Sequence, residues 1–238
     1  MKLLVSPKSV IEAQECIQAE VDIIDVKNPD EGSLGANFPW VIKKIRELAP
    51  TTIPISATIG DISYKPGSVS LAALGAATAG ASYVKVGLYQ ITTIAQGIEI
   101  MKAVRKTIDE FHLPVKIVAS GYAEGTAIGS LPPEKIPQIA SEANSDYVML
   151  DTYDKTKGKT IFDLLSNNFL AKFIADAKAY KLGVALGGSI NLTHLNQLQV
   201  LQPDIVGIRG AVCDNNDRIK GEMKEHLIQQ FLTEIRKI

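Results

Sequence analysis

The sequence has few cysteines, almost no net charge and no long hydrophobic run, and each scarcity excludes a class of protein. Its two cysteines, Cys16 and Cys213, form no CxxC pair, so we expect both thiols to be reduced and buried rather than part of a disulfide scaffold. Its 25 basic and 26 acidic residues give a formal net charge of −1, which excludes a basic nucleic-acid footprint at the level of the whole chain.

Hydrophobic runs are short throughout the chain. The apolar run LLV near the N-terminus is too short for a signal peptide. No apolar stretch free of charges and turn signals reaches the ~18 residues of a membrane-spanning helix. We therefore expect a cytoplasmic protein that has neither a nucleic-acid nor a membrane partner.

Aliphatic residues, by contrast, are abundant. Hydrophobic residues make up 46% of the 238 positions and charged residues 21%, so the chain can bury a large core, and intrinsic disorder is excluded. Eight βα units of about 30 residues need about 240 residues, close to the ~250 typical of a TIM barrel. Many other single domains share this length, so the length alone decides nothing.

Short apolar runs alternate with longer amphipathic or alanine-rich stretches, which is typical of buried parallel strands separated by helices. The predicted strands are Lys2–Ser6, Asp22–Lys27, Pro54–Ile59, Tyr83–Leu88, Val115–Ser120, Tyr147–Thr152, Gly183–Gly187 and Ile205–Arg209. The predicted helices are Ser9–Ala19, Pro39–Leu48, Ser68–Ala79, Thr92–Phe111, Pro133–Ala143, Leu164–Tyr180, Leu192–Leu201 and Glu222–Ile235.

Eight strands and eight helices in strict alternation fit either a closed barrel or a doubly wound open sheet. An open dinucleotide-binding sheet usually carries GxGxxG after its first strand, whereas this chain has SPKS there. No linker rich in proline, serine or glycine divides the chain. We therefore predict an α/β fold, a single-domain TIM (β/α)8 barrel over residues 1–238.

Charged residues fall at the ends of predicted strands, where a TIM barrel places its active site. Asp25 and Lys27 share one face of the second strand by alternation, Lys85 lies in the fourth strand, and Asp151 ends the sixth. They could form inward salt bridges that only fill the barrel mouth. They could also be catalytic, because a lysine that is desolvated, or that lies beside a second cation, has a lowered pKa, as a Schiff-base nucleophile requires.

Glycine turns follow the seventh and eighth predicted strands. The seventh strand runs into Gly187, Gly188 and Ser189, and the eighth runs into Arg209 and Gly210, which are the usual positions of a barrel phosphate site. Backbone N–H groups approach a phosphate where side chains are absent, and Arg209 or Ser189 could add a donor. The same glycines could also serve only to form turns.

Other candidate chemistry is weaker. The loop TYDKTKGKT carries Lys155 and two further lysines, and it could cover a phosphorylated substrate or be a solvated charge run. His112, His194 and His226 lie away from the predicted strand ends, which argues against a His-ligated zinc ion. Nicotinamide and pyridoxal phosphate fingerprints are absent, although a barrel lysine alone does not exclude pyridoxal phosphate. We predict no metal and no cofactor.

Several segments resemble one known family. The sequences DIIDVKNPDEGSLGANFPWVI, ISATIGDISYKPGSVSLAALGAA and YVKVGLY, with LDT, GGSI and DIVGIRGA further along, resemble the (5-formylfuran-3-yl)methyl phosphate synthase family of methanofuran biosynthesis. The likeness covers nearly the whole chain. It implies a homo-oligomeric TIM barrel that condenses two molecules of glyceraldehyde 3-phosphate.

The resemblance also implies roles for individual residues. Lys27 matches the family's Schiff-base lysine and Lys85 its proton acceptor, while Asp25, Asp151 and Lys155 match supporting catalytic positions. Two alternatives stay open. One is another Schiff-base aldolase acting on a phosphorylated sugar, and the other is a non-catalytic barrel that binds phosphosugars.

Overall fold

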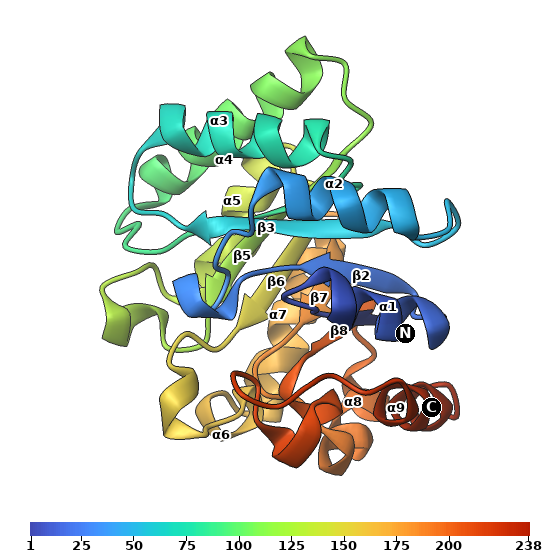
Figure 1. Cartoon of the computed structure of the whole chain (residues 1–238). Helices are drawn as coiled ribbons and strands as arrows, with labels where there is room; N and C mark the ends of the chain where they lie inside the picture. The colour runs from blue at the N-terminus through green and yellow to red at the C-terminus, as the bar shows by residue number, and fades with distance from the viewer.

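Each strand of the sheet pairs in parallel with the next strand along the chain, and the last strand pairs back with the first. Figure 1 shows the strands running through the centre of the molecule. The computed structural model describes residues 1–238, and this pairing closes its eight strands into one barrel. The predicted TIM barrel is therefore confirmed, and the doubly wound open sheet is excluded. The strands are β1 (Lys2–Val5), β2 (Ile23–Val26), β3 (Ile55–Asp61), β4 (Tyr83–Gly87), β5 (Lys116–Tyr122), β6 (Tyr147–Asp151), β7 (Gly183–Leu186) and β8 (Ile205–Ile208).

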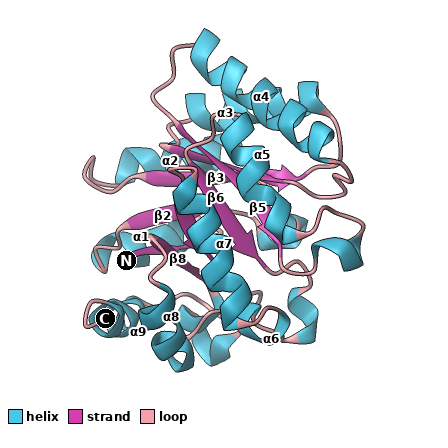
Figure 2. Ribbon diagram, turned by 180° about the vertical axis from the view of Figure 1, so that it is seen from behind, coloured by secondary structure: helices cyan, strands magenta, loops and turns pink.

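Helices surround this barrel on its outside (Figure 2). They are α1 (Val10–Gln18), α2 (Pro39–Leu48), α3 (Pro66–Thr78), α4 (Ile94–Glu110), α5 (Ile136–Glu142), α6 (Ile161–Leu164), α7 (Asn167–Ala179), α8 (Leu195–Leu201) and α9 (Glu225–Ile235). Local sequence explains several starts. The Ser9 side chain accepts a hydrogen bond from the backbone N–H of Glu12, and α2 and α3 begin at Pro39 and Pro66, where a missing N–H costs nothing.

Several of the predicted helices differ from those observed. In the stretches predicted as Pro133–Ala143 and Leu192–Leu201 the first three residues form a 3-10 turn, so α5 begins at Ile136 and α8 at Leu195. The stretch predicted as one helix, Leu164–Tyr180, contains the end of α6 and then α7, because Leu165 and Ser166 are extended and the Ser166 side chain caps α7. The last helix begins at Glu225 rather than at Glu222, because Met223 forms an antiparallel bridge with Cys213. The bridge to Cys213 thus shortens the last helix, although its sequence pattern favours a helix from Glu222 onward.

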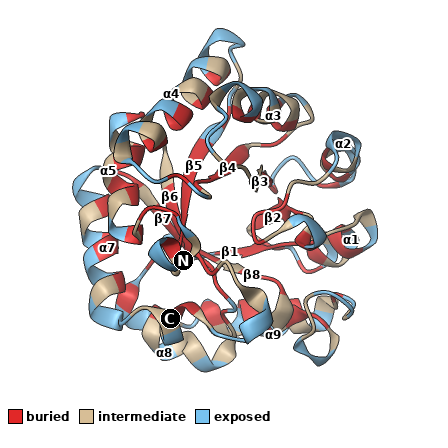
Figure 3. Ribbon diagram, turned by 90° about the vertical axis from the view of Figure 1, so that its left-hand side faces the viewer, coloured by how far each residue is buried: buried red, intermediate tan, exposed pale blue.

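The core has two parts. The larger part lies between the strands and the inner faces of the helices, so the strands are buried while the outer helix faces are exposed (Figure 3). The smaller part fills the barrel interior with Leu4, Ile23, Tyr83, Val118, Met149, Ala185 and Ile205. Asp25 and Lys85 follow Ile23 and Tyr83 by two residues, so a polar layer lies directly above this apolar layer, toward the C-terminal strand ends.

Both cysteines are buried and unpaired, as expected. Burial raises the pKa of the Cys16 thiol well above its usual value, and its Sγ lies 3.4 Å from Met223 Sδ. Burial likewise raises the pKa of Cys213 to about 11, so both thiols are protonated packing groups at neutral pH. None of the helices combines the length and apolar character needed to cross a membrane.

Candidate active site

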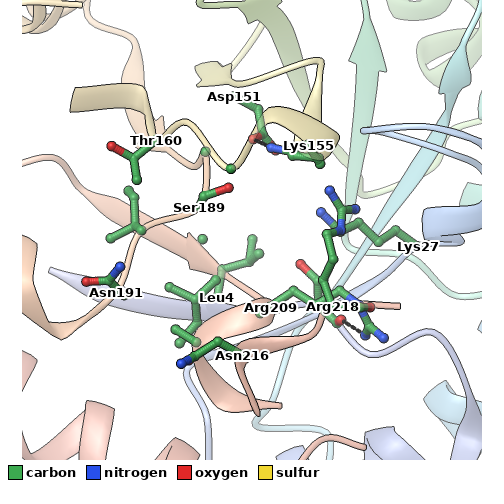
Figure 4. Close-up of a pocket in the computed structure, with 18 of the residues that line it drawn as sticks. Leu4, Lys27, Asp151, Lys155, Thr160, Ser189, Asn191, Arg209, Asn216 and Arg218 are labelled. Atoms are coloured by element: carbon green, nitrogen blue, oxygen red, sulfur yellow. Dashed lines mark hydrogen bonds and ion pairs between the residues drawn. The ribbon is translucent and has the colours of Figure 1, made fainter. Parts of the chain in front are cut away.

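A cavity of about 530 Å³ opens at the C-terminal ends of the strands (Figure 4). Of the ten predicted site residues, eight line this cavity, namely Lys27, Lys85, Asp151, Lys155, Gly188, Ser189, Arg209 and Gly210. Asp25 and Gly187 do not line it, and their contacts place them behind the lining residues. The barrel thus brings together residues that are as far apart in the sequence as Lys27 and Gly210.

Asp25 and Lys85 form a buried ion pair below the cavity. Lys85 Nζ lies 2.6 Å from Asp25 Oδ2, and the two side chains are 2% and 0% exposed. The same oxygen accepts a 2.9 Å hydrogen bond from Ser6 Oγ, while Asp25 Oδ1 is buried and has no protein partner. Burial alone would raise the pKa of Asp25, but Lys85 and then Lys27 outweigh it and lower that pKa, so the carboxylate stays ionised.

Lys27 directly follows β2, and no carboxylate is bonded to it. Its Nζ donates one long hydrogen bond, 3.5 Å, to the backbone carbonyl of Ser33. The pKa of Lys27 is lowered to about 7, chiefly by burial and further by the positive charges of Lys85 and Arg218, with Asp151 opposing. The lowered pKa expected from the sequence is therefore present, with desolvation rather than the second lysine as its main cause. A large fraction of Lys27 is a free amine near neutral pH.

Asp151 and Lys155 form the second ion pair of the site. Lys155 Nζ donates to Asp151 Oδ1 and, at 2.6 Å, to Thr152 Oγ1, across a short 3-10 turn that Asp154 caps. Burial opposes ionisation of Asp151, but Lys155 and then Lys27 outweigh it and lower its pKa to about 2. Burial lowers the pKa of Lys155, with Asp151 opposing.

The remaining lysines of that loop behave differently from Lys155. Lys157 pairs with Asp154 in solvent, its side chain 69% exposed, and Lys159 is exposed as well. One lysine of the three therefore belongs to the cavity, and the other two form the solvated face of the loop.

The glycine turn after β7 is tightly packed. Gly188 has φ +103°, and a Cβ there would lie 2.9 Å from Thr152 Cγ2; a Cβ on Gly187 would lie 2.9 Å from Met149 Cε. Ser189 also has a left-handed backbone, φ +55°. The backbone N–H groups of Gly188 and Ser189 donate to no protein acceptor. The turn thus presents two free N–H donors at the cavity, as an anion site requires.

Arg209 and Arg218, both beside the cavity, are held in different ways. Arg209 Nη1 and Nη2 bind Glu12 at 2.7 and 3.1 Å, Nη1 also binds the Ser6 carbonyl, and Nε binds the Arg218 carbonyl. No nitrogen of Arg209 is left without a protein partner for the predicted phosphate contact. In Arg218, by contrast, Nε and Nη2 are buried without any acceptor. Sequence reasoning missed Arg218 because no periodic pattern surrounds it in the segment between β8 and α9.

Asp61 and Tyr122 were also missed. They end β3 and β5, which run two residues beyond the predicted ends at Ile59 and Ser120. Tyr122 Oη donates to Asp61 Oδ1, and Asp61 Oδ2 accepts the backbone N–H of Leu34 at 3.1 Å. This pair therefore holds the loop that follows β2 and carries Ser33 beside Lys27. Alternation along β3 could not reveal Asp61, because a register shift separates it from Thr58.

Solved structures of other enzymes share this barrel. A 3-hexulose-6-phosphate synthase superposes with a TM-score of 0.64 at 16% identity, and phosphoribosyl anthranilate isomerase from Thermus thermophilus with 0.65 at 12%. Each comparison covers 100% of this chain and 99% of the other. At these identities the likeness shows the fold alone.

Sequence comparison gives the family. The profile described as 4-HFC-P synthase matches residues 3–232. The chain is 49% identical over 231 residues to (5-formylfuran-3-yl)methyl phosphate synthase of Methanocaldococcus jannaschii, covering 97% of this chain and 98% of the relative. It is 47% identical over 232 residues to the protein of that name in Methanococcus maripaludis, covering 98% of each chain. The chain therefore belongs to the 4-HFC-P synthase family.

Proposed function

We propose that this protein condenses two molecules of glyceraldehyde 3-phosphate into (5-formylfuran-3-yl)methyl phosphate through a Schiff base on Lys27, as a step of methanofuran biosynthesis. The observation that carries the proposal is Lys27 itself, a buried amine with a pKa of about 7 and no bonded carboxylate, facing a cavity that also holds a glycine turn. Family membership supports the same product.

The overall balance requires no redox cofactor. Two triose phosphates minus one phosphoric acid and two waters give the furan aldehyde phosphate, with no change of oxidation state. Release of phosphate from carbon makes the enzyme a carbon–oxygen lyase acting on phosphates. The residues must therefore supply a carbonyl-activating amine, acids and bases, and anion binding, and the cavity offers all three.

Lys27 activates the first triose. Its free amine attacks the aldehyde, and loss of water gives an iminium ion that acidifies the neighbouring carbon. Asp151 is positioned to stabilise that positive charge, since its carboxylate already opposes the lowering of the Lys27 pKa and stays ionised at a pKa of about 2.

The two ion pairs divide the proton transfers. Lys85 lines the cavity and Asp25 does not, so Lys85 meets the substrate while Asp25 holds it. Lys85 is therefore the residue that exchanges protons with the substrate, and the Asp25 carboxylate, 2.6 Å from its Nζ, keeps it in position. Lys155, whose pKa burial lowers, serves as the acid for a departing hydroxyl group.

The phosphate that the product keeps binds at the glycine turn after β7, where the N–H groups of Gly188 and Ser189 are free, with Gly210 at the neighbouring strand end. Gly187 allows this turn to pack against Met149 and Asp151. Arg209 instead fixes the segment after β8 through its bonds to Glu12 and to the Arg218 carbonyl. That the enzyme is cytoplasmic and homo-oligomeric stays a prediction.

One experiment tests the proposal directly. The protein is incubated with glyceraldehyde 3-phosphate, product is followed by the ultraviolet absorbance of a conjugated furan aldehyde, and a parallel sample is reduced with borohydride and mapped by mass spectrometry. We expect absorbance growth and a single adduct on Lys27, with both lost in Lys27→Arg. An adduct without the furan chromophore would indicate a simple aldolase, and tight binding without adduct or product would indicate a binding protein.

A further inference from the structure

The segment between β8 and α9 holds an arginine whose role the proposed reaction leaves open. Arg218 lines the cavity, and its buried Nε and Nη2 have no acceptor in the protein. A guanidinium nitrogen that is buried without a partner is costly, so such a nitrogen is normally paired or reserved for a ligand. Its neighbour Arg209 is fully paired, which shows that this region can satisfy an arginine where the fold requires one.

Arg218 is held in place by its backbone rather than by its side chain. The Arg218 carbonyl accepts the 2.8 Å bond from Arg209 Nε, and Asp217 Oδ1 accepts the backbone N–H groups of Ile219 and Lys220 at 2.9 and 3.0 Å. Gly221 closes the turn where a Cβ would lie 2.4 Å from the Asp214 carbonyl. The backbone is thus fixed while the guanidinium donors stay free, which is the arrangement of a preorganised anion site.

The surroundings of Arg218 are cationic. Its charge contributes to lowering the pKa of both Lys27 and Lys155, so it lies close to both amines, and Figure 4 shows Arg218 and Lys27 extending toward the same part of the cavity. Among the negative charges, Asp151 has the largest effect on the pKa of Arg218, and it is already bonded to Lys155. A doubly charged phosphate would satisfy this excess of positive charge, and a guanidinium binds phosphate with two parallel hydrogen bonds.

We propose that Arg218 anchors a second phosphate subsite, separate from the glycine turn, which receives the phosphate group that leaves the triose bound on Lys27. This inference rests on the proposed function, because a reaction of two triose phosphates brings two phosphates into the cavity and releases one. The aldehyde carbon that forms the Schiff base survives as the formyl group of the product. In the product, the three carbons that come from this triose, the formyl carbon among them, carry no phosphate. The triose on Lys27 is therefore the one that loses its phosphate group.

The elimination balances without any further reactant. Removal of the proton on the carbon beside the iminium gives an enamine, and its electron pair then expels the phosphate from the third carbon. The carbon–oxygen bond breaks, both electrons pass to the phosphate oxygen, and the Arg218 guanidinium stabilises the developing charge. The phosphate-free skeleton left on Lys27 is an α,β-unsaturated iminium ion, and the second triose, as its enediol, adds to the terminal carbon of that iminium through its own middle carbon.

Binding of inorganic phosphate tests the subsite without turnover. Isothermal titration should give two phosphates per chain for the wild-type protein and for Lys220→Gln, an exposed cation of the same segment. Arg218→Gln should bind one phosphate, and Arg218→Lys should keep the second site with affinity weakened about 10-fold, because the charge remains but the two-pronged contact is lost. One phosphate per wild-type chain, or unchanged binding in Arg218→Gln, would overturn the proposal.

Kinetic measurements on an Arg218 variant test whether this residue acts on the departing phosphate. In Arg218→Gln we expect borohydride trapping on Lys27 to persist while kcat falls about 100-fold and KM changes much less. Unchanged kcat with normal furan formation would refute the subsite and leave the proposed function standing. Absence of furan from the wild-type protein would refute the proposed function, whereas the phosphate titration would still decide whether Arg218 binds phosphate. Thermal unfolding of Arg218→Lys and Arg218→Gln controls for folding.

Discussion

The pH dependence of Schiff-base formation on Lys27 gives the sharpest test of the site. With a pKa of about 7, roughly half of Lys27 is a free amine at pH 7, against about 1 in 3,000 for a lysine at its ordinary value of 10.5. Adduct formation should therefore be about 1,500-fold faster than for an unperturbed lysine, and its rate should rise through pH 7 and level off above pH 8.

Two substitutions should move this midpoint in opposite directions. Asp151 raises the pKa of Lys27, so Asp151→Asn should shift the midpoint to lower pH. Lys85 lowers that pKa, so Lys85→Gln should shift the midpoint to higher pH, helped by the Asp25 carboxylate that it leaves unpaired. Arg218, a further charge that acts on Lys27, is unchanged in both variants.

The assay measures the initial rate of trapping between pH 5.5 and pH 9.5, with glyceraldehyde 3-phosphate and cyanoborohydride and with mass spectrometry to quantify the Lys27 adduct. It reads imine formation and is independent of later steps, so variants that make no product can still be compared. A wild-type midpoint near pH 10, or an upward shift in Asp151→Asn, would refute the electrostatic account of Lys27.

Three further outcomes are expected. Asp25→Asn leaves Lys85 buried without its carboxylate and should lower the free energy of unfolding by about 3–5 kcal/mol. At about 2 °C per kcal/mol, the midpoint of thermal unfolding should fall by roughly 6–10 °C, and a shift of under about 2 °C would contradict a buried ion pair. Gly188→Ala should raise KM for glyceraldehyde 3-phosphate and should destabilise the fold more than Gly129→Ala. Both glycines have positive φ, but only Gly188 is crowded, so equal losses of stability in the two variants would show that crowding is unimportant. Tyr122→Phe removes the bond to Asp61 and should lower kcat while borohydride trapping on Lys27 persists; a loss of trapping would assign the pair to imine formation instead.

The barrel could be predicted because its signals are local and repeated. Every predicted strand is present, since apolar runs between turn signals leave little choice of structure. The errors fall where tertiary contacts override local pattern, as at Met223, which pairs with Cys213 instead of starting a helix. The grouping of Lys27, Lys85 and Asp151 could also be predicted, because parallel strands of one barrel bring their C-terminal ends together.

What could not be predicted is which charged side chains are already paired. The sequence does not show that Glu12 occupies the guanidinium of Arg209 across 197 positions, or that Arg218 is left free. Both are arginines near the end of the barrel, and only Arg209 follows a strand. The position after a strand therefore identified Arg209, whose side chain is already paired. Arg218, which has no partner, lies in a segment without a periodic hydrophobic pattern.

The pairing of charges explains how one cavity can hold two lysines, a nucleophile and an anion site without conflict. Lys85 and Lys155 each have a bonded carboxylate, so both side chains are held at defined positions. Lys27 and Arg218 have none. A lysine without a carboxylate in a dry site loses its proton and becomes a nucleophile, whereas an arginine in the same situation keeps its charge and needs an anion. The same absence of a partner thus gives the two residues opposite chemistry, and a triose phosphate, an aldehyde at one end and a dianion at the other, matches both.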